Sequence, residues 1–62
     1  MSKHAHTLKE AAEALGVSRR TVYIEIGAGR LQSFTIGRRR LISDEALRRY
    51  VEARERESAR HV

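Results

Sequence analysis

The spacing of apolar residues near the start of the chain predicts a short helix over residues 8–15. Its apolar face repeats at the i, i+3, i+4 and i+7 spacing of an amphipathic helix and consists of Leu8, Ala11, Ala12 and Leu15. Thr7 and Glu10 match the capping box that satisfies backbone N–H groups at a helix start. Gly16 can adopt the left-handed backbone conformation that commonly ends a helix. These signals together bound a helix of about two turns.

A second helix is predicted from about Arg19 to Ile26, after a three-residue turn of Gly, Val and Ser. Ser18 is a favoured cap residue, and a Gly-Ala-Gly sequence ends the helix. At about 100° per residue, Val22 and Ile26 lie within about 40° of each other and are expected to face the core, to which Leu31 returns. The opposite face and one flank are mixed in chemistry, with Arg20, Thr21 and Ile24 on the face and Arg19 and Tyr23 on the flank.

The next segment predicts a β-hairpin with a basic tip. Its first strand runs from Phe34 to Ile36, the turn is at Gly37 and Arg38, and the second strand lies near Arg40 to Ile42. Ser43 then caps a third helix, whose first turn carries two acidic residues that suit the positive end of the helix dipole. The apolar stripe of this helix is Leu47, Tyr50 and Val51, and its last turns are expected to fray.

These elements predict one mainly α domain with a small β-hairpin, in the order α-α-β-β-α. Residues 1–6 show no apolar periodicity and are expected to form a flexible tail, the domain spans 7–57, and 58–62 are expected to be a frayed tail. Two short capped helices joined by a three-residue turn form a helix-turn-helix. The second helix of that motif is commonly presented to the DNA major groove.

Length and composition exclude several classes of function. A chain of 62 residues is too small for a deep catalytic cleft, and no nucleophile, base and orienting group can be assembled from it, so it is not expected to be an enzyme. It has no cysteine, and His4 and His6 have no third ligand nearby, so we predict no metal, cofactor or small-molecule ligand. No apolar run approaches about 18 residues, and a cytoplasmic location without membrane contact is expected.

The charge distribution points to a polyanionic partner. The formal net charge is +5, and residues 26–43 hold four arginines and no acidic residue. A focused basic segment of this kind is typical of nucleic-acid binding. Together with the helix-turn-helix, it predicts double-stranded DNA as the partner.

Two stretches of the chain resemble a known family. LKEAAEALGVSRRTVY, followed by GRLQSFTIGRRRLISDEAL, is similar to the small winged-helix excisionase domain, which is related to the DNA-binding heads of MerR-type regulators. The resemblance covers about Leu8 to Val51. It implies a winged helix-turn-helix in which the second helix enters the major groove and the hairpin, or wing, reaches the adjacent minor groove or the backbone. It further implies neighbouring copies on DNA and a phage or plasmid integrase as partners.

The expected DNA contacts fall into two groups. Those of the second helix with the major groove are Ser18, Arg19, Arg20, Thr21, Tyr23 and Ile24. Those of the wing and its approach with the backbone are Arg30, Arg38, Arg39 and Arg40. The alternatives are a solvated helix face for the first group and, for the hairpin arginines, charge that protects a strand edge from pairing.

The sequence departs from the family pattern at three positions. Ile24 and Glu25 stand where members often carry Arg, and Arg40 stands where they often carry an aromatic residue. Ile24 is expected to touch either a thymine methyl group or a neighbouring protein copy. Glu25 is expected either to accept a hydrogen bond from a cytosine amine or to repel phosphate.

Two functions remain open at this point, with an excisionase favoured. An excisionase binds tandem sites, bends the DNA and directs integrase-mediated site-specific recombination toward excision. The alternative is a small MerR-like transcriptional regulator or repressor, but MerR-type proteins carry a long dimerising helix after the head, where this chain has at most about 14 residues. A protein-only adaptor would not need the basic wing. The charged segment after Val51, where Glu52 and Arg56 can pair, is either a solvated helix end or a surface for integrase or a second copy.

Overall fold

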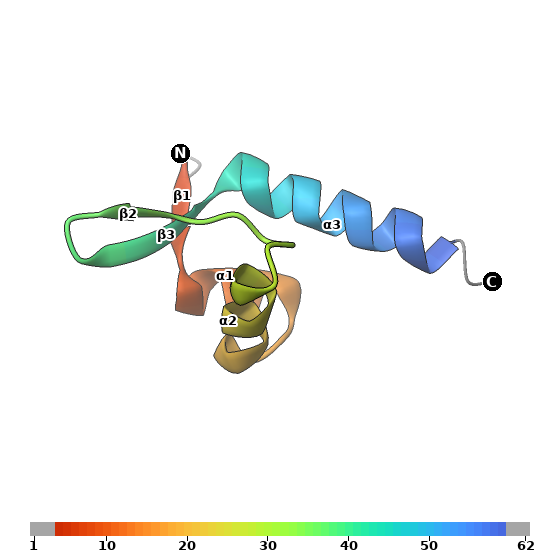
Figure 1. Ribbon diagram of the computed structural model, residues 1–62, viewed down its shortest axis with the longest axis horizontal. Helices are drawn as coiled ribbons and strands as arrows, with labels where there is room; N and C mark the ends of the chain where they lie inside the picture. The colour runs from red at the N-terminus through yellow and green to blue at the C-terminus, as the bar shows by residue number, and fades with distance from the viewer. Residues whose placement is uncertain (1–3, 60–62) are drawn as a thin grey trace.

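The computed structural model describes residues 4–59, which form three helices and a three-stranded antiparallel sheet (Figure 1). In chain order the elements are β1 (Ala5–Thr7), α1 (Leu8–Leu15), α2 (Arg19–Gly27), β2 (Phe34–Ile36), β3 (Arg39–Ser43) and α3 (Asp44–Ala59). The three predicted helices and the predicted hairpin are confirmed, with boundaries that differ by one residue at the end of α2 and at both ends of β3.

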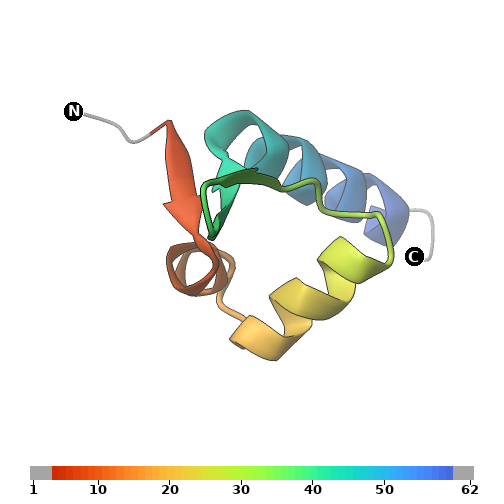
Figure 2. The same cartoon turned by 60° about the vertical axis from the view of Figure 1, so that its left-hand side comes forward.

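The helix-turn-helix is fixed by the local capping contacts that the sequence predicted. Thr7 Oγ1 accepts a hydrogen bond from the Glu10 backbone N–H at 3.1 Å, and the Glu10 carboxylate accepts one from the Thr7 N–H at 2.9 Å. Gly16 ends α1 with a φ of 73°, a conformation that costs little only for glycine. Figure 2 shows the short turn that follows and leads into α2.

The sheet has β3 at its centre, between β1 and β2. Leu41 of β3 pairs with Thr7 on one side and with Phe34 on the other. The β2–β3 connection has two residues, Gly37 and Arg38, and Gly37 has a φ of 61°. Glycine at the first position of a two-residue loop is typical of a type II′ turn, which suits the right-handed twist of the strands. The hairpin projects from the body (Figure 1), and Arg38 belongs to the two-residue turn at its tip.

One small core joins the two helices of the motif to β3 and α3. Its buried residues are Ala11, Ala12, Val22, Leu31, Ile42 and Leu47. The two alanines let α1 approach its neighbours closely, and Leu31 returns to the core as predicted. In contrast, Val51, which we expected in the apolar stripe of α3, is exposed.

The expectation of a flexible tail over 1–6 is wrong for residues 5 and 6, which belong to β1; residues 1–3 lie outside the described residues. β1 exists because β3 offers it a free edge: Ala5 pairs with Ser43 and His6 with Ile42. The element order is therefore β-α-α-β-β-α. A three-residue strand that depends on a distant partner leaves no periodic signal in the sequence.

The frayed tail expected from residue 58 is also wrong for Ser58 and Ala59, which complete α3; residues 60–62 lie outside the described residues. The last turns are rich in Ala, Arg and Glu, which favour helix. The ion pairs between two described residues of α3 are Glu45 with Arg49 at 2.8 Å and Arg54 with Glu57 at 3.2 Å, and Glu52 does not pair with Arg56 there. Across residues 4–59, no helix has the length and apolar character needed to cross a membrane.

Candidate nucleic-acid interface

The first turn of α2 is organised by two hydroxyl groups from the expected site. Ser18 Oγ accepts a hydrogen bond from the Thr21 backbone N–H at 3.2 Å and lies 3.0 Å from Thr21 Oγ1. Ser18 is exposed and Thr21 is half-buried. Both hydroxyls thus stabilise the start of α2, which fixes the backbone positions from which the Arg19 and Arg20 side chains extend.

The middle of α2 presents one face to solvent and buries the other. Val22 is 1% exposed, whereas Tyr23 and Ile24 are 59% and 53% exposed. Arg20 is exposed one turn before Ile24, and its side chain forms no ion pair or hydrogen bond with any residue in the range 4–59. The burial of Val22 confirms the predicted helix orientation, and Arg20 and Ile24 share an open face that can approach a partner.

A hollow of about 280 Å³ lies where the start of α1, the flank of α2 and β3 meet. It is lined by Thr7, Leu8, Lys9, Arg19, Tyr23, Arg39 and Arg40. Four of these side chains are cationic and none is acidic. The fold therefore brings Arg19 and Tyr23 of the helix together with two hairpin arginines that are about 20 residues away in sequence.

Lys9 is a member of this basic hollow that the sequence did not single out. It lies in the first turn of α1, on the exposed side of the helix. Its neighbours in the hollow come from α2 and β3, so only the tertiary arrangement reveals it. The available signal was a cation beside the helix cap, which is common on solvated helices.

The hairpin arginines differ in how firmly they are held. Arg40 Nη1 donates a hydrogen bond to Ser33 Oγ at 2.8 Å, which restrains this guanidinium. Arg38 and Arg39 are exposed, and neither forms an ion pair or side-chain hydrogen bond with another described residue. Their guanidinium groups keep all their donors available, and guanidinium donors match phosphate oxygens well.

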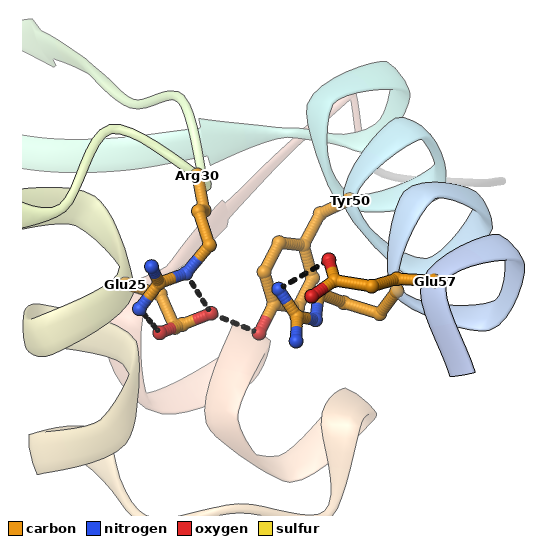
Figure 3. A network of polar contacts seen from close by, with 5 residues as sticks. Glu25, Arg30, Tyr50 and Glu57 are labelled. Carbon is orange, nitrogen blue, oxygen red and sulfur yellow. Dashed lines mark hydrogen bonds and ion pairs between the residues drawn. The ribbon is translucent and has the colours of Figure 1, made fainter. Parts of the chain in front are cut away.

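Arg30 does not line the hollow, and its side chain pairs with Glu25 of the same chain (Figure 3). Its Nε and Nη2 donate to the two carboxylate oxygens of Glu25 at 3.1 and 2.6 Å. The hydroxyl of Tyr50 donates to the same carboxylate at 2.7 Å. The phosphate contact expected of Arg30 would have to compete with this bidentate pair.

Glu25 lies on α2 but not on its exposed face. Its side chain is only 12% exposed, and its two oxygens are occupied by Arg30 and Tyr50. Neither of the contacts considered from the sequence, to a cytosine amine or against phosphate, suits a carboxylate in this position. The hydrogen bonds from Arg30 and Tyr50 lower the pKa of Glu25 from an ordinary 4.5 to about 2. Burial and the adjacent carboxylate raise the pKa of Tyr50.

The two histidines near the start of the chain, His4 and His6, both contact Asp44. His6 Nε2 lies 3.0 Å from Asp44 Oδ1, and the His4 carbonyl accepts a hydrogen bond from the Asp44 N–H at 3.0 Å. These contacts attach β1 to the start of α3. Within residues 4–59, no group of three or more His, Cys, Asp or Glu side chains is arranged to hold a metal ion.

Comparison with known proteins gives one match. A family model described as a helix-turn-helix domain matches residues 7–55, which is most of the chain. Searches of curated proteins and of solved structures return no match. The matched segment includes α1, α2, the hairpin and most of α3, and so contains both the exposed face of α2 and the basic hollow.

Proposed function

This chain belongs to the helix-turn-helix domain family, and from that premise we propose that α2 enters the DNA major groove while the β2–β3 hairpin contacts the adjacent minor groove or backbone. A helix-turn-helix domain implies DNA binding, and such domains are typically not catalytic. In this proposal the hairpin is a wing, and the partner is double-stranded DNA.

The basic hollow is the observation that carries the proposal. Lys9, Arg19, Arg39 and Arg40 line one concave surface together with the aromatic ring of Tyr23 and no acidic group. Contacts with phosphate fix the register of a protein on the duplex and supply most of its sequence-independent affinity. A phosphate held here would connect the recognition helix to the wing. Arg38, at the hairpin tip, would extend this contact along the groove.

Base recognition is assigned to the exposed face of α2. Arg20 can form a bidentate contact with guanine, and Ile24, one turn later, can touch a thymine methyl group. Their exposure and the lack of an internal partner for Arg20 among the described residues support this role. Ser18 and Thr21 contribute through the helix start, where hydroxyl and backbone N–H groups commonly contact phosphate.

The biological role we propose is that of an excisionase. One helix of nine residues contacts only a few base pairs, so specificity requires several copies in tandem or a partner on the same DNA. Copies bound in a row can bend the duplex, at an elastic cost of about 1 to 6 kcal/mol that is offset by the protein–DNA interactions the bend permits. The bend would bring the arms bound by a phage or plasmid integrase together, in the cytoplasm of a bacterial host, and direct recombination toward excision.

Footprinting and a recombination assay test this role together. In the footprinting experiment, the protein is titrated onto the attachment region of the phage or plasmid that encodes it. In the recombination assay, it is added to an in vitro reaction that contains the integrase encoded next to its own gene. Tandem protected sites that fill cooperatively, with more excision and less integration, support an excisionase. Protection at a nearby promoter without a change in recombination supports the small transcriptional regulator instead. No protection on either DNA rejects both roles.

A double variant provides the control for that assay. Arg38→Ala with Arg39→Ala removes two hairpin cations that pair with no residue in the described range 4–59, and it leaves the core intact. It should lose both protection and the effect on recombination at concentrations at which the wild-type protein is active. An effect on recombination that survives in this variant would mean that the wing does not act through DNA.

A further inference from the structure

We propose that Glu25 is a positioning residue for DNA binding: by holding Arg30 and Tyr50 it sets the angle of α2 relative to the wing and α3, and thereby governs specificity. This inference rests on the proposed use of α2 and the hairpin on DNA. Glu25 itself does not touch the DNA, because its side chain is nearly buried on the flank of α2 that faces α3.

The carboxylate of Glu25 joins three parts of the chain at one point. It comes from the last turns of α2, Arg30 comes from the segment between α2 and β2, and Tyr50 comes from α3 (Figure 3). Each carboxylate oxygen accepts at least one hydrogen bond, from the Arg30 guanidinium or the Tyr50 hydroxyl, at 2.6 to 3.1 Å. Charge-assisted hydrogen bonds of this kind are directional and stronger than neutral ones. They therefore restrict how far α2 can rotate against α3.

The backbone of Glu25 holds the same segment a second time. Its carbonyl oxygen accepts hydrogen bonds from the N–H groups of Arg30 at 3.1 Å and Leu31 at 3.2 Å. Leu31 is in turn buried in the core. The side-chain carboxylate and the backbone carbonyl of Glu25 thus both hold the connection between α2 and the hairpin. Figure 2 shows this connection passing α3.

This arrangement has two consequences for binding. The angle between α2 and the hairpin decides whether the base-contacting face and the basic hollow can meet the duplex at the same time. In addition, the only acidic residue of α2 is neutralised by Arg30 on the side away from the hollow. Loss of the network should therefore lower the affinity for a selected duplex, because binding there needs the correct geometry. The affinity for random DNA, which is bound mainly through charge, should change little.

The test compares Glu25→Gln with Glu13→Gln, a matched change of one charge. The Glu13 side chain is exposed on α1 and has no hydrogen bond or ion pair within residues 4–59. The probes are a 20-bp duplex that the wild-type protein enriches from a random library and a scrambled duplex of the same composition. We expect Glu25→Gln to lower the affinity ratio of selected to scrambled duplex about tenfold, the order of one charge-assisted hydrogen bond, and Glu13→Gln to leave this ratio unchanged. Equal ratios for the two variants, measured well below both melting temperatures, would overturn the inference.

Two further measurements keep the outcome clear if Glu25→Gln folds poorly. Tyr50→Phe removes only the phenolic donor, and it should lower the same ratio by a smaller factor. Residual dipolar couplings on the free protein should show a changed angle between α2 and α3 in both network variants and not in Glu13→Gln. An unchanged angle contradicts the positioning role whatever the DNA result, whereas a wild-type protein that enriches no duplex contradicts the proposed function instead.

Discussion

Replacing Arg38 and Arg39 together with alanine is expected to weaken binding to every duplex and to make its salt dependence shallower. Both side chains are exposed, and neither is committed to another described residue, so both are available to phosphate. Each phosphate contact contributes about −0.9 to the slope of log affinity against log salt concentration. Loss of two contacts should therefore make the slope less negative by about 1.8.

The size of the effect can be stated for one salt range. Raising the salt from about 50 to 200 mM is a fourfold change, which weakens each phosphate contact by about 3.5-fold at this slope. The double variant should therefore lose about 12-fold less affinity over this range than the wild-type protein. The largest difference in affinity between the two proteins is expected at the lowest salt.

Fluorescence anisotropy with a labelled 20-bp duplex measures both slopes, and a thermal melt of each protein checks that it is folded. Arg48→Ala with Arg56→Ala is the matched control, because it removes from α3 two exposed charges that pair with no other residue in the range 4–59. The control should retain most of the wild-type slope. A hairpin variant with the full slope, or a control that loses as much, would show that the wing does not contact the backbone.

The remaining predictions concern base recognition, the core and pH. Arg20→Ala should weaken the binding free energy by about 1 to 3 kcal/mol on a selected duplex and by much less on a scrambled one, as measured by anisotropy. Equal losses on the two duplexes would make Arg20 a phosphate contact. Val22→Ala should lower stability by about 2 kcal/mol, and the melting temperature by about 8 to 16 °C, because Val22 is 1% exposed in a small core; an unchanged melting temperature would refute the helix orientation. Because the pKa of Glu25 falls from 4.5 to about 2 in the folded state, its contribution to stability is present above pH 4.5 and is lost as the pH falls toward 2. Acid titration of Glu25→Gln by circular dichroism should therefore show a smaller loss of stability over this range than the wild-type protein.

The parts of the fold that local chemistry determines were predictable from the sequence. Thr7 with Glu10, Gly16 and Ser18 each act within a few residues of their own position, and they set the ends of α1 and the start of α2. Ser43 likewise accepts a hydrogen bond from the Ala46 N–H at the start of α3. Caps of this kind satisfy backbone groups that the helix itself cannot, so their signals survive in the sequence.

The features that the sequence did not indicate depend on partners far along the chain. β1 needs the edge of β3, and Lys9 belongs to the basic hollow only because β3 packs beside α1. Glu25 offers the clearest case. Its position on α2 suggested a DNA contact, whereas its carboxylate accepts a hydrogen bond from Tyr50, which is 25 residues away. Neither periodicity nor spacing contains information on such contacts.

Mapping amide and arginine side-chain chemical shifts during titration with the selected 20-bp duplex tests the central claim most directly. If α2 and the wing bind DNA as proposed, the largest changes should occur at residues 19–24, at 38–40 and at Lys9, and the last turns of α3 should change little. Changes confined to α3 and to the turn around Val17, with none in the hairpin, would contradict this interface.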